Sequence, residues 1–423
     1  MKSLDAFESV LPVEMDLKSV VRNPVIDQLP FRKGPDGHVD LAPLWRRVDR
    51  ESTYLAALEG KEPQSFFRST PTTGRSLVIP LKWSSPGVRT NSGQIEINPD
   101  ERNRFTVIFI KGTGTPLGAI GNTARPWRGG ESINVGPASR TTGRFFGPKE
   151  HSVFFGSDII GGYGLSPDYQ LQDEFRWGIE LASAGVRVSM PLAVGRISER
   201  DAYFNKPCPG GEDEKPAILI SAGRSRWTWA DFFSIPTNKP YLAGKIIEEG
   251  LNSLVSDGLL EEGIINEINS QPPEERIRSL TLLYFEKAAD VLGENFARAH
   301  ALKALGNRNM QNTSAAVEIR DVDDDPGDFL SNTSSLFAKC MDIQSQLNNI
   351  YRLMDHLDPG LRQDNIGQIT ERFLEKYFSS NLGVSKKVYG MFLLWQQIST
   401  FIIGFEPSQG VAVAAYRRIA KKS

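Results

Sequence analysis

The sequence predicts a mixed α+β fold, in which a small antiparallel sheet with one helix precedes a mainly helical part. Two observations carry this expectation. Short apolar runs separated by turn-forming residues fill positions 76 to 112, and one capped helix and two more strand-like runs follow before residue 224. From about Tyr241 onward the pattern is nearly all helical.

The chain has 423 residues, which is enough for two or three domain-sized units. Residues 1–75 mix charged helical pieces with Pro- and Gly-rich stretches, and they are expected to form an extension packed on the main body. Residues 76–238 are expected to form the strand-rich unit, and residues 239–423 the helical unit.

Composition excludes several function classes. Lysine plus arginine number 49 against 51 aspartate plus glutamate, so no broad positive field favours nucleic acid or an anionic membrane. The two cysteines, Cys208 and Cys340, are far apart, and only four histidines occur, so a disulfide framework or a zinc centre is not expected.

The pattern of apolar residues favours a cytoplasmic protein. The N-terminal segment has acidic residues and no long apolar run, unlike a secretory signal. The most apolar stretch, residues 390–405, is too short for a bilayer span and contains Gln396 and Gln397. It is expected to be a buried core helix.

Three runs predict the first strands as an antiparallel meander: SLVIPLKW (76–83), GQIEI (93–97) and RFTVIFIKG (104–112). The helix is expected within residues 165–185, with Ser166 as N-cap, Pro167 at the first helical position and Gly185 just past the end. Its packed face would hold Leu171, Phe175, Gly178 and Ala182. Two further strands follow, within 186–197 and 215–223.

Lys111 is the first candidate for chemistry. It ends the run Ile108-Phe109-Ile110-Lys111, which resembles the V-A-I-K of protein kinases, where a strand lysine holds the nucleotide phosphates. Apolar strands that end in lysine are common, so the match alone is weak. The following helix offers Glu174 as the carboxylate that would orient Lys111, with Glu180 as the alternative.

A second candidate site lies between residues 300 and 325. His300 and Asn307 have the spacing of the kinase catalytic loop H-R-D-L-x-x-x-N, with Leu302 at the position of the aspartate. Strands at 308–311 and 316–320, joined by a turn at 312–314, would return Asp321 toward Asn307 and Asn309.

Amide and carboxylate oxygens brought together in this way suit Mg²⁺ bound to phosphates. Asp323 is a further candidate ligand. The alternative is that the aspartates at 321 and 323–325 form a solvated acidic turn.

The order of these pieces is that of protein-kinase-like folds, which have a sheet-and-helix N-lobe and a mainly helical C-lobe. Within that group the chain resembles the selenoprotein O family of pseudokinases. The resemblance rests on four short segments that stand in the family's order and cover about a quarter of the chain: IKGTGTP (110–116), the segment from Gln172 to Gly195, SRWTWADFF (225–233) and ARAHALKALGNRNMQ (297–311).

The resemblance implies a bilobal fold that binds ATP in an inverted orientation and transfers AMP to a hydroxyl group. It implies a Lys111–Glu174 pair, a metal bound by Asp321 and either Asn307 or Asn309, and Arg226 near the phosphates. The chain departs from the family at Arg308, where the family has an aspartate if Asn309 is the metal ligand, and at Ile220, where an arginine is expected.

A Gly- and Arg-rich segment, residues 113–164, separates Lys111 from the helix. Its arginines include Arg128 and Arg144, which could contact a triphosphate beside backbone N–H groups of the glycines. No G-x-G-x-x-G stands directly before a strand, so a flexible loop with some functional arginines is favoured.

The sequence therefore predicts an ATP- and Mg²⁺-dependent nucleotidyltransferase of kinase-like fold, with an unknown protein or small-molecule hydroxyl as acceptor. Two alternatives stay open. One is phosphoryl transfer, as in a kinase. The other is a silent pseudokinase that binds nucleotide and serves as an interaction module.

Overall fold

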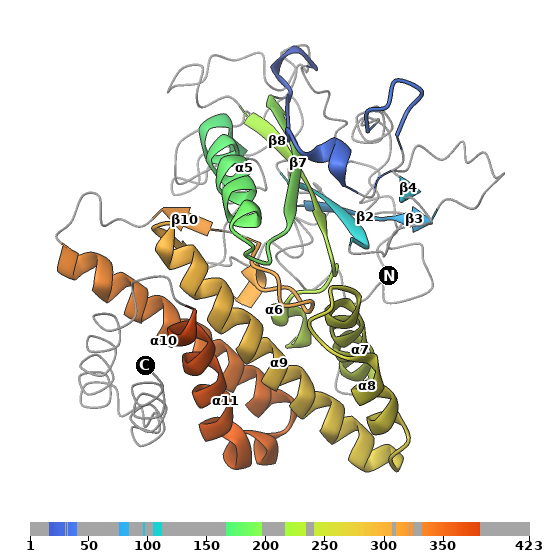
Figure 1. Cartoon of the computed structure of the whole chain (residues 1–423), viewed down its shortest axis with the longest axis vertical. Helices are drawn as coiled ribbons and strands as arrows, with labels where there is room; N and C mark the ends of the chain where they lie inside the picture. Colours follow the sequence, from blue (N-terminus) through green and yellow to red (C-terminus); the bar gives the residue numbers. More distant parts are fainter. Residues whose placement is uncertain are drawn as a thin grey trace, which may run out of the picture. The chain divides into compact units, whose positions relative to one another are not determined.

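The computed structural model describes residues 17–29, 31, 33–39, 76–83, 96–97, 105–111, 166–196, 216–233, 241–306, 310–320, 322–324 and 332–380. The chain divides into two compact units (Figure 1). The sheet unit comprises residues 1–176 and 190–226, and the helical unit comprises residues 177–189 and 227–423. The described residues thus form a mixed α+β protein, as predicted.

The sheet unit is built on one antiparallel sheet. Its strands follow the spatial order β1 (Val21–Arg22), β7 (Met190–Arg196), β8 (Pro216–Gly223), β5 (Val107–Lys111) and β2 (Ser76–Pro80). The short strand β6 (Ser166–Pro167) pairs with β8. Ile108 and Ile110 of β5 and Ile220 of β8 are fully buried, so the central strands carry the core of this unit.

The predicted meander of three successive strands is wrong. β2 pairs directly with β5, whereas β3 (Lys82–Trp83) and β4 (Glu96–Ile97) form a separate parallel pair. The run that contains β4 alternates apolar and polar residues, while β2 and β5 are almost continuously apolar. β5 lies between β8 and β2, and its continuously apolar run suits a central strand whose side chains are largely buried on both faces.

Helix α5 (Asp168–Ser183) lies beside the sheet (Figure 1). Leu171 and Phe175 are buried, as expected for its packed face. Ser166 and Pro167 belong to β6 and do not serve as cap and first turn, because they pair with Ala217 and Pro216 of β8. Gly185 follows the helix with φ +78°, the left-handed conformation that ends many helices.

Part of the N-terminal extension completes the edge of the sheet. β1 pairs antiparallel with β7, and the Asn23 side chain donates a 2.6 Å hydrogen bond to the Pro191 carbonyl. Ile26, in the short 3-10 helix η3 (Ile26–Gln28), is 2% exposed. Residues 21–26 therefore belong to the sheet unit, and the pairing of β1 with the sheet goes beyond the extension that the sequence predicted.

The helical unit contains α6 (Trp229–Phe232), α7 (Tyr241–Ser256), α8 (Glu262–Asn269), α9 (Pro273–Ala301), α10 (Asn332–Leu357) and α11 (Pro359–Ser379). The long helix α9 packs against α11, with the rings of Phe296 and Phe373 6.1 Å apart in an edge-to-face contact. The Trp229 indole N–H donates to the Tyr284 hydroxyl at 2.8 Å, and both side chains are fully buried.

Two short antiparallel strands follow α9. β9 (Ala304–Gly306) pairs with β10 (Val322–Asp324), and Gly306 stands opposite Val322. Between them lie the 3-10 helix η6 (Met310–Asn312) and a hairpin that spans residues 312–320. Its stem is closed by the Arg320 N–H, which donates to the Asn312 carbonyl at 2.8 Å, and by the bridge between Thr313 and Ile319.

The hairpin differs from the predicted one. Residues 310–312 form a 3-10 turn where a strand was expected, and the reversal lies at residues 314–317, where the Val317 N–H donates to the Ser314 carbonyl at 2.9 Å. The apolar residues Ala315, Ala316 and Val317 are fully buried, so burial outweighed the turn preference of Asn312-Thr313-Ser314. The backbone of residues 322–324 forms strand β10, whereas Asp321, Asp325 and the side chains of 322–324 lie outside the described part, so exposure of the aspartates to solvent stays a prediction.

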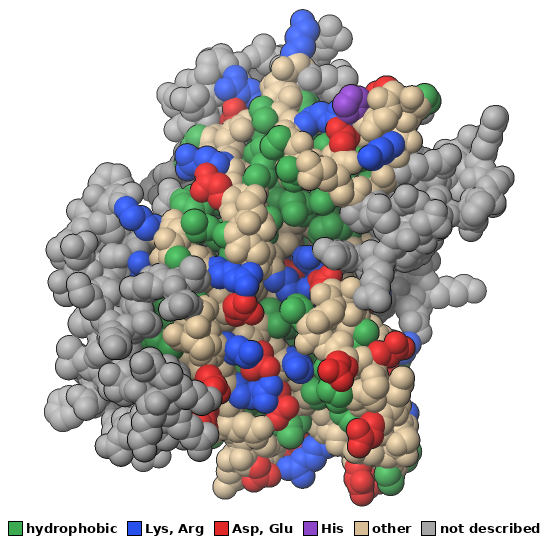
Figure 2. Space-filling view, in the orientation of Figure 1, with side chains coloured by type: hydrophobic (Ala, Val, Ile, Leu, Met, Phe, Trp, Pro, Cys, Tyr) green, Lys and Arg blue, Asp and Glu red, His purple; other side chains and the backbone are tan. Residues whose placement is uncertain are grey.

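In the part of the chain that the structure describes, no helix is long and apolar enough to cross a membrane. Residues 390–405, predicted to be a core helix, lie outside the described residues. Over the helical unit, acidic and basic side chains are interspersed on the face shown in Figure 2. This mixture agrees with the formal net charge of −2.

We expect Gly250→Ala to destabilise the helical unit. A Cβ at Gly250 in α7 would lie 2.3 Å from the Ala315 carbonyl oxygen and 2.9 Å from the Tyr284 ring. Relieving that overlap should lower the free energy of unfolding by about 1–3 kcal/mol. The matched control is Gly244→Ala in the same helix, where a Cβ meets nothing within 4 Å.

Gly244→Ala should raise the free energy of unfolding by about 0.5–1 kcal/mol, because alanine favours the helix. Urea denaturation followed by circular dichroism measures both changes. Equal effects of the two substitutions would contradict the close packing of α7 on the hairpin.

Candidate functional site

Lys111 and Glu174 form an ion pair within the sheet unit. The Lys111 Nζ lies 2.5 Å from the Glu174 Oε2. Their side chains are only 22% and 16% exposed, so the contact is partly shielded from water. Glu180, the alternative partner, is exposed. The predicted contact is confirmed, whereas its role in binding a nucleotide stays a prediction.

The sheet holds Lys111 in a defined place. It is the last residue of β5, paired with Ser76 of β2 on one side and with Leu219 of β8 on the other. Strand neighbours alternate faces, so the buried Ile110 anchors one face while Lys111 points to the other, toward α5. The lysine therefore comes from a central strand and its carboxylate from a helix packed beside it.

This arrangement is suited to holding an anion. An ammonium group is a compact charge with three N–H donors, so a contact with one carboxylate is compatible with a second anionic ligand. The carboxylate limits the rotamers of the Lys111 side chain, which lowers the entropy lost when a phosphate binds. Glu174 itself is oriented by α5.

The first turn of α5 is tied to the sheet. Asp168, which is 6% exposed, accepts a hydrogen bond of 2.6 Å from the Arg196 Nε at the end of β7. Asp168 also accepts from the Gln172 amide one turn later. Because these contacts fix the helix beside the strands, they also fix the position of Glu174.

Arg226 is the third predicted site residue that the structure describes in the sheet unit, after Lys111 and Glu174. It follows β8 and is partly buried. The neighbouring Arg224 places its guanidinium 5.1 Å from the centre of the Phe105 ring, and its carbonyl accepts from the Thr106 hydroxyl at 2.9 Å. The segment after β8 is thereby tied to the beginning of β5.

The other predicted site residues are described only in part or not at all. Arg128, Arg144, Asn307, Asn309 and Asp321 lie outside the described residues. The backbone of Asp323 belongs to β10, where it pairs with Leu305, and its side chain lies outside the described part.

The proposed alignment of His300 with a catalytic loop is wrong. His300 is in the last turn of α9, is 1% exposed, and contacts Asp342 Oδ2 at 3.0 Å and the Tyr377 hydroxyl at 2.8 Å. Leu302 is the C-cap of the same helix. The helix and β9 occupy most of residues 300–306, so these residues cannot form one loop, and His300 links α9 to α10 and α11.

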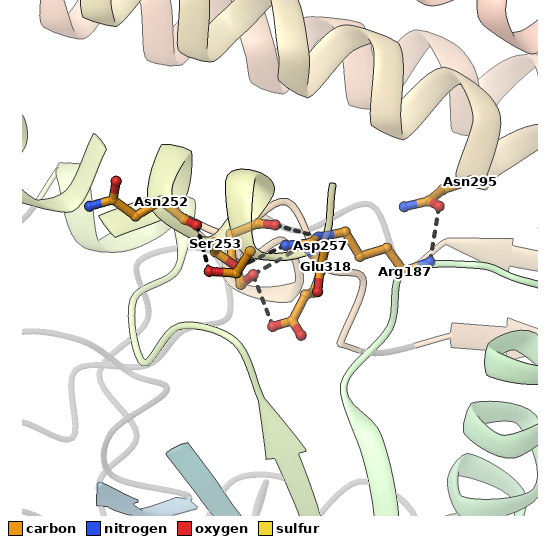
Figure 3. A network of polar contacts seen from close by, with 9 residues as sticks. Arg187, Asn252, Ser253, Asp257, Asn295 and Glu318 are labelled. Atoms are coloured by element: carbon orange, nitrogen blue, oxygen red, sulfur yellow. Dashed lines mark hydrogen bonds and ion pairs between the residues drawn. The ribbon is translucent and has the colours of Figure 1, made fainter. Parts of the chain in front are cut away.

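One buried network was not predicted. Arg187 joins four segments of the helical unit (Figure 3). Its guanidinium donates to Asp257, to the Ser253 hydroxyl at 2.8 Å and to the Ala316 carbonyl at 2.8 Å. Its backbone N–H donates to the Asn295 side chain at 3.0 Å. The only sequence signal was an arginine inside the apolar run Val186-Arg187-Val188.

Arg320, in the stem of the hairpin, lies among acidic groups. Burial lowers its pKa below the usual value, while the charges of Glu318, Asp231 and Glu249 act in the opposite direction. Its guanidinium donates to the Trp227 carbonyl at 3.4 Å. The hairpin is thus held by charged and polar contacts as well as by its buried alanines.

Within the described ranges, no group of three or more histidine, cysteine, aspartate or glutamate side chains could hold a metal ion. Burial raises the pKa of Cys340 to about 12, so its thiol stays protonated at neutral pH.

No protein-family model and no curated protein sequence matches the chain. Among the predicted site residues, the Lys111–Glu174 pair is the contact that the structure describes.

Proposed function

We propose that the protein is an ATP-dependent transferase of protein-kinase-like fold, and that it moves AMP to a hydroxyl acceptor. The observation that carries the proposal is the Lys111–Glu174 ion pair. A lysine from a sheet strand that pairs with a glutamate from the next helix is the phosphate-holding device of protein kinases.

The order of elements supports the same proposal. β5 with Lys111 is followed by α5 with Glu174, then by the sheet strands β7 and β8, and then by a helical unit. After the long helix α9 come two paired short strands with a hairpin between them. This is the order that the kinase-like lobes require, and the short catalytic segments would lie beside β9 and β10.

The proposed metal ligands flank that strand pair. Asn307 is the residue after Gly306 and Asp321 is the residue before Val322, and Gly306 pairs with Val322. Consecutive Cα atoms are only about 3.8 Å apart. Asn307 and Asp321 are each one residue away from this pair, so the amide of one and the carboxylate of the other could bind the same Mg²⁺ ion, which prefers oxygen ligands.

The absence of a carboxylate after β9 favours AMP transfer over phosphoryl transfer. A kinase has an aspartate in the catalytic loop to accept the proton of the attacking hydroxyl. Here the six residues 307–312 read Asn-Arg-Asn-Met-Gln-Asn. In the proposed reaction the acceptor oxygen bonds to the α-phosphorus, the bond to the bridging oxygen breaks, pyrophosphate leaves and the proton passes to water.

A thermal shift measurement tests ligand binding. We expect ATP with Mg²⁺ to raise the melting temperature, because a ligand at 100 times its dissociation constant stabilises the folded state by about 2.7 kcal/mol. ATP without a divalent ion should give a much smaller shift, since Lys111 would then face the phosphates without the metal. No shift with Mg²⁺ and millimolar ATP would overturn the proposal.

A further inference from the structure

The geometry points to Arg187 as a positioning residue that clamps the hairpin 312–320 and thereby sets the backbone that leads into Asp321. This inference rests on the proposed function, in which Asp321 binds the metal. Arg187 is far from Asp321 in the sequence. The contacts of Arg187 that support this role all lie within the helical unit.

Arg187 forms hydrogen bonds with the hairpin at two places. Its Nε donates to the Ala316 carbonyl at the tip, and its own carbonyl accepts from the Ile319 N–H in the stem at 2.9 Å. Ser189 continues this edge, because its N–H donates to the Ile319 carbonyl at 3.2 Å. Val188 thereby forms an isolated parallel bridge with Ile319 of the hairpin.

The clamp is itself anchored. Asp257 and Ser253, at the C-terminal end of α7, hold the guanidinium, and Asn295 of α9 holds the Arg187 backbone (Figure 3). The side chains of Arg187 and Asp257 are 6% and 9% exposed. A forked guanidinium in such a buried setting has few alternative geometries, so the Ala316 carbonyl is held in one place.

The hairpin needs external support. Val317, which is fully buried, has φ +60°, a conformation that β-branched residues strongly disfavour. Such a conformation persists only where the surroundings impose it. Arg187 holds the residue before Val317, and the Tyr284 hydroxyl holds the Ala315 carbonyl at 2.8 Å. Without the clamp, the turn should relax toward ordinary dihedral angles.

Relaxation of the turn would be passed on to Asp321. The hairpin ends at Arg320, and β10 begins at Val322, so the two described neighbours of Asp321 belong to the hairpin and to the β9–β10 pair. A change in the stem of the hairpin would move Arg320 relative to Val322. We therefore expect Arg187 to affect the metal dependence of ATP binding without touching the nucleotide.

The test compares two variants with one control. In Arg187→Met/Asp257→Leu, apolar side chains replace the buried pair, which avoids leaving one charge uncompensated. Arg187→Lys keeps the charge but lacks the fork that reaches several acceptors. The control, Arg372→Met/Asp290→Leu, removes an ion pair of 2.5 Å between α11 and α9 that does not touch the hairpin.

Two quantities are measured on each full-length variant: amide hydrogen exchange of residues 317–320 and the Mg²⁺ concentration that half-saturates ATP binding. For the variants at Arg187 we expect at least tenfold faster exchange and at least a tenfold higher Mg²⁺ midpoint. The control should match the parent in both, whatever its melting temperature. If the double variant does not fold, the amide exchange and the Mg²⁺ midpoint of Arg187→Lys are compared with those of the parent.

The two possible failures can be told apart. A parent protein that binds no ATP with Mg²⁺ overturns the proposed function and this inference with it. A parent that binds Mg²⁺ and ATP, with folded Arg187 variants whose exchange and Mg²⁺ midpoint are unchanged, overturns this inference alone.

Discussion

Replacing Lys111 with methionine is expected to lower the affinity for ATP about 10- to 100-fold, the range that follows from losing a hydrogen bond to a charged group. Transfer activity should fall to background. Methionine keeps most of the aliphatic stem, so the packing of β5 should survive. The unfolding free energy should fall by about 1–3 kcal/mol, between the limits for exposed and buried ion pairs.

The glutamate variants sharpen this prediction. Glu174→Gln removes the charge that orients Lys111 and should weaken ATP binding in the same direction, but less. Glu180→Gln is the matched control, because Glu180 lies on the same helix and is exposed. Isothermal calorimetry with ATP and Mg²⁺ measures all three. If Lys111→Met and Glu180→Gln bind ATP equally well, the Lys111–Glu174 pair is a structural contact only.

Replacing Asp321 with alanine is expected to abolish the part of ATP binding that depends on Mg²⁺. A carboxylate contributes a charged oxygen ligand that an alanine cannot replace. Residual binding without metal should match the parent, because this variant leaves Lys111 and Glu174 unchanged. The measurement is a titration of Mg²⁺ at fixed ATP, followed by the change in melting temperature.

Neighbouring aspartates provide the control for Asp321. Asp323→Ala separates the two proposed carboxylate ligands, and Asp324→Ala and Asp325→Ala remove adjacent charges. A specific site predicts a dominant effect at Asp321. Equal, small effects at all four positions would instead support general attraction of Mg²⁺ to a cluster of acidic residues, and would contradict the assignment of Asp321 as a ligand.

The sequence was most informative where local pattern and chemistry agreed. Lys111 ends an apolar strand. Glu174 lies beside the buried residues Leu171 and Phe175, on the side of the helix that packs against the rest of the protein. The Lys111–Glu174 contact over 63 residues was predicted because a strand that ends in lysine, followed by a helix with a glutamate, resembles the order found in protein kinases.

The sequence was misleading where spacing alone supported an assignment. His300 and Asn307 match a loop motif, yet the apolar pattern of α9 extends through Ala299, and His300 is needed inside the helical core. Arg187 could not be found from sequence because its side-chain partners Asp257 and Ala316 are 70 and 129 residues away. Such contacts arise only from tertiary packing.

The proposed function requires that AMP, and not the terminal phosphate, is transferred. The direct measurement is incubation of the protein and candidate hydroxyl acceptors with Mg²⁺ and ATP labelled at the α or the γ position. For AMP transfer, we expect that label from the α position becomes covalently attached, that pyrophosphate is released, and that Lys111→Met abolishes both. Covalent label from the γ position alone would contradict it.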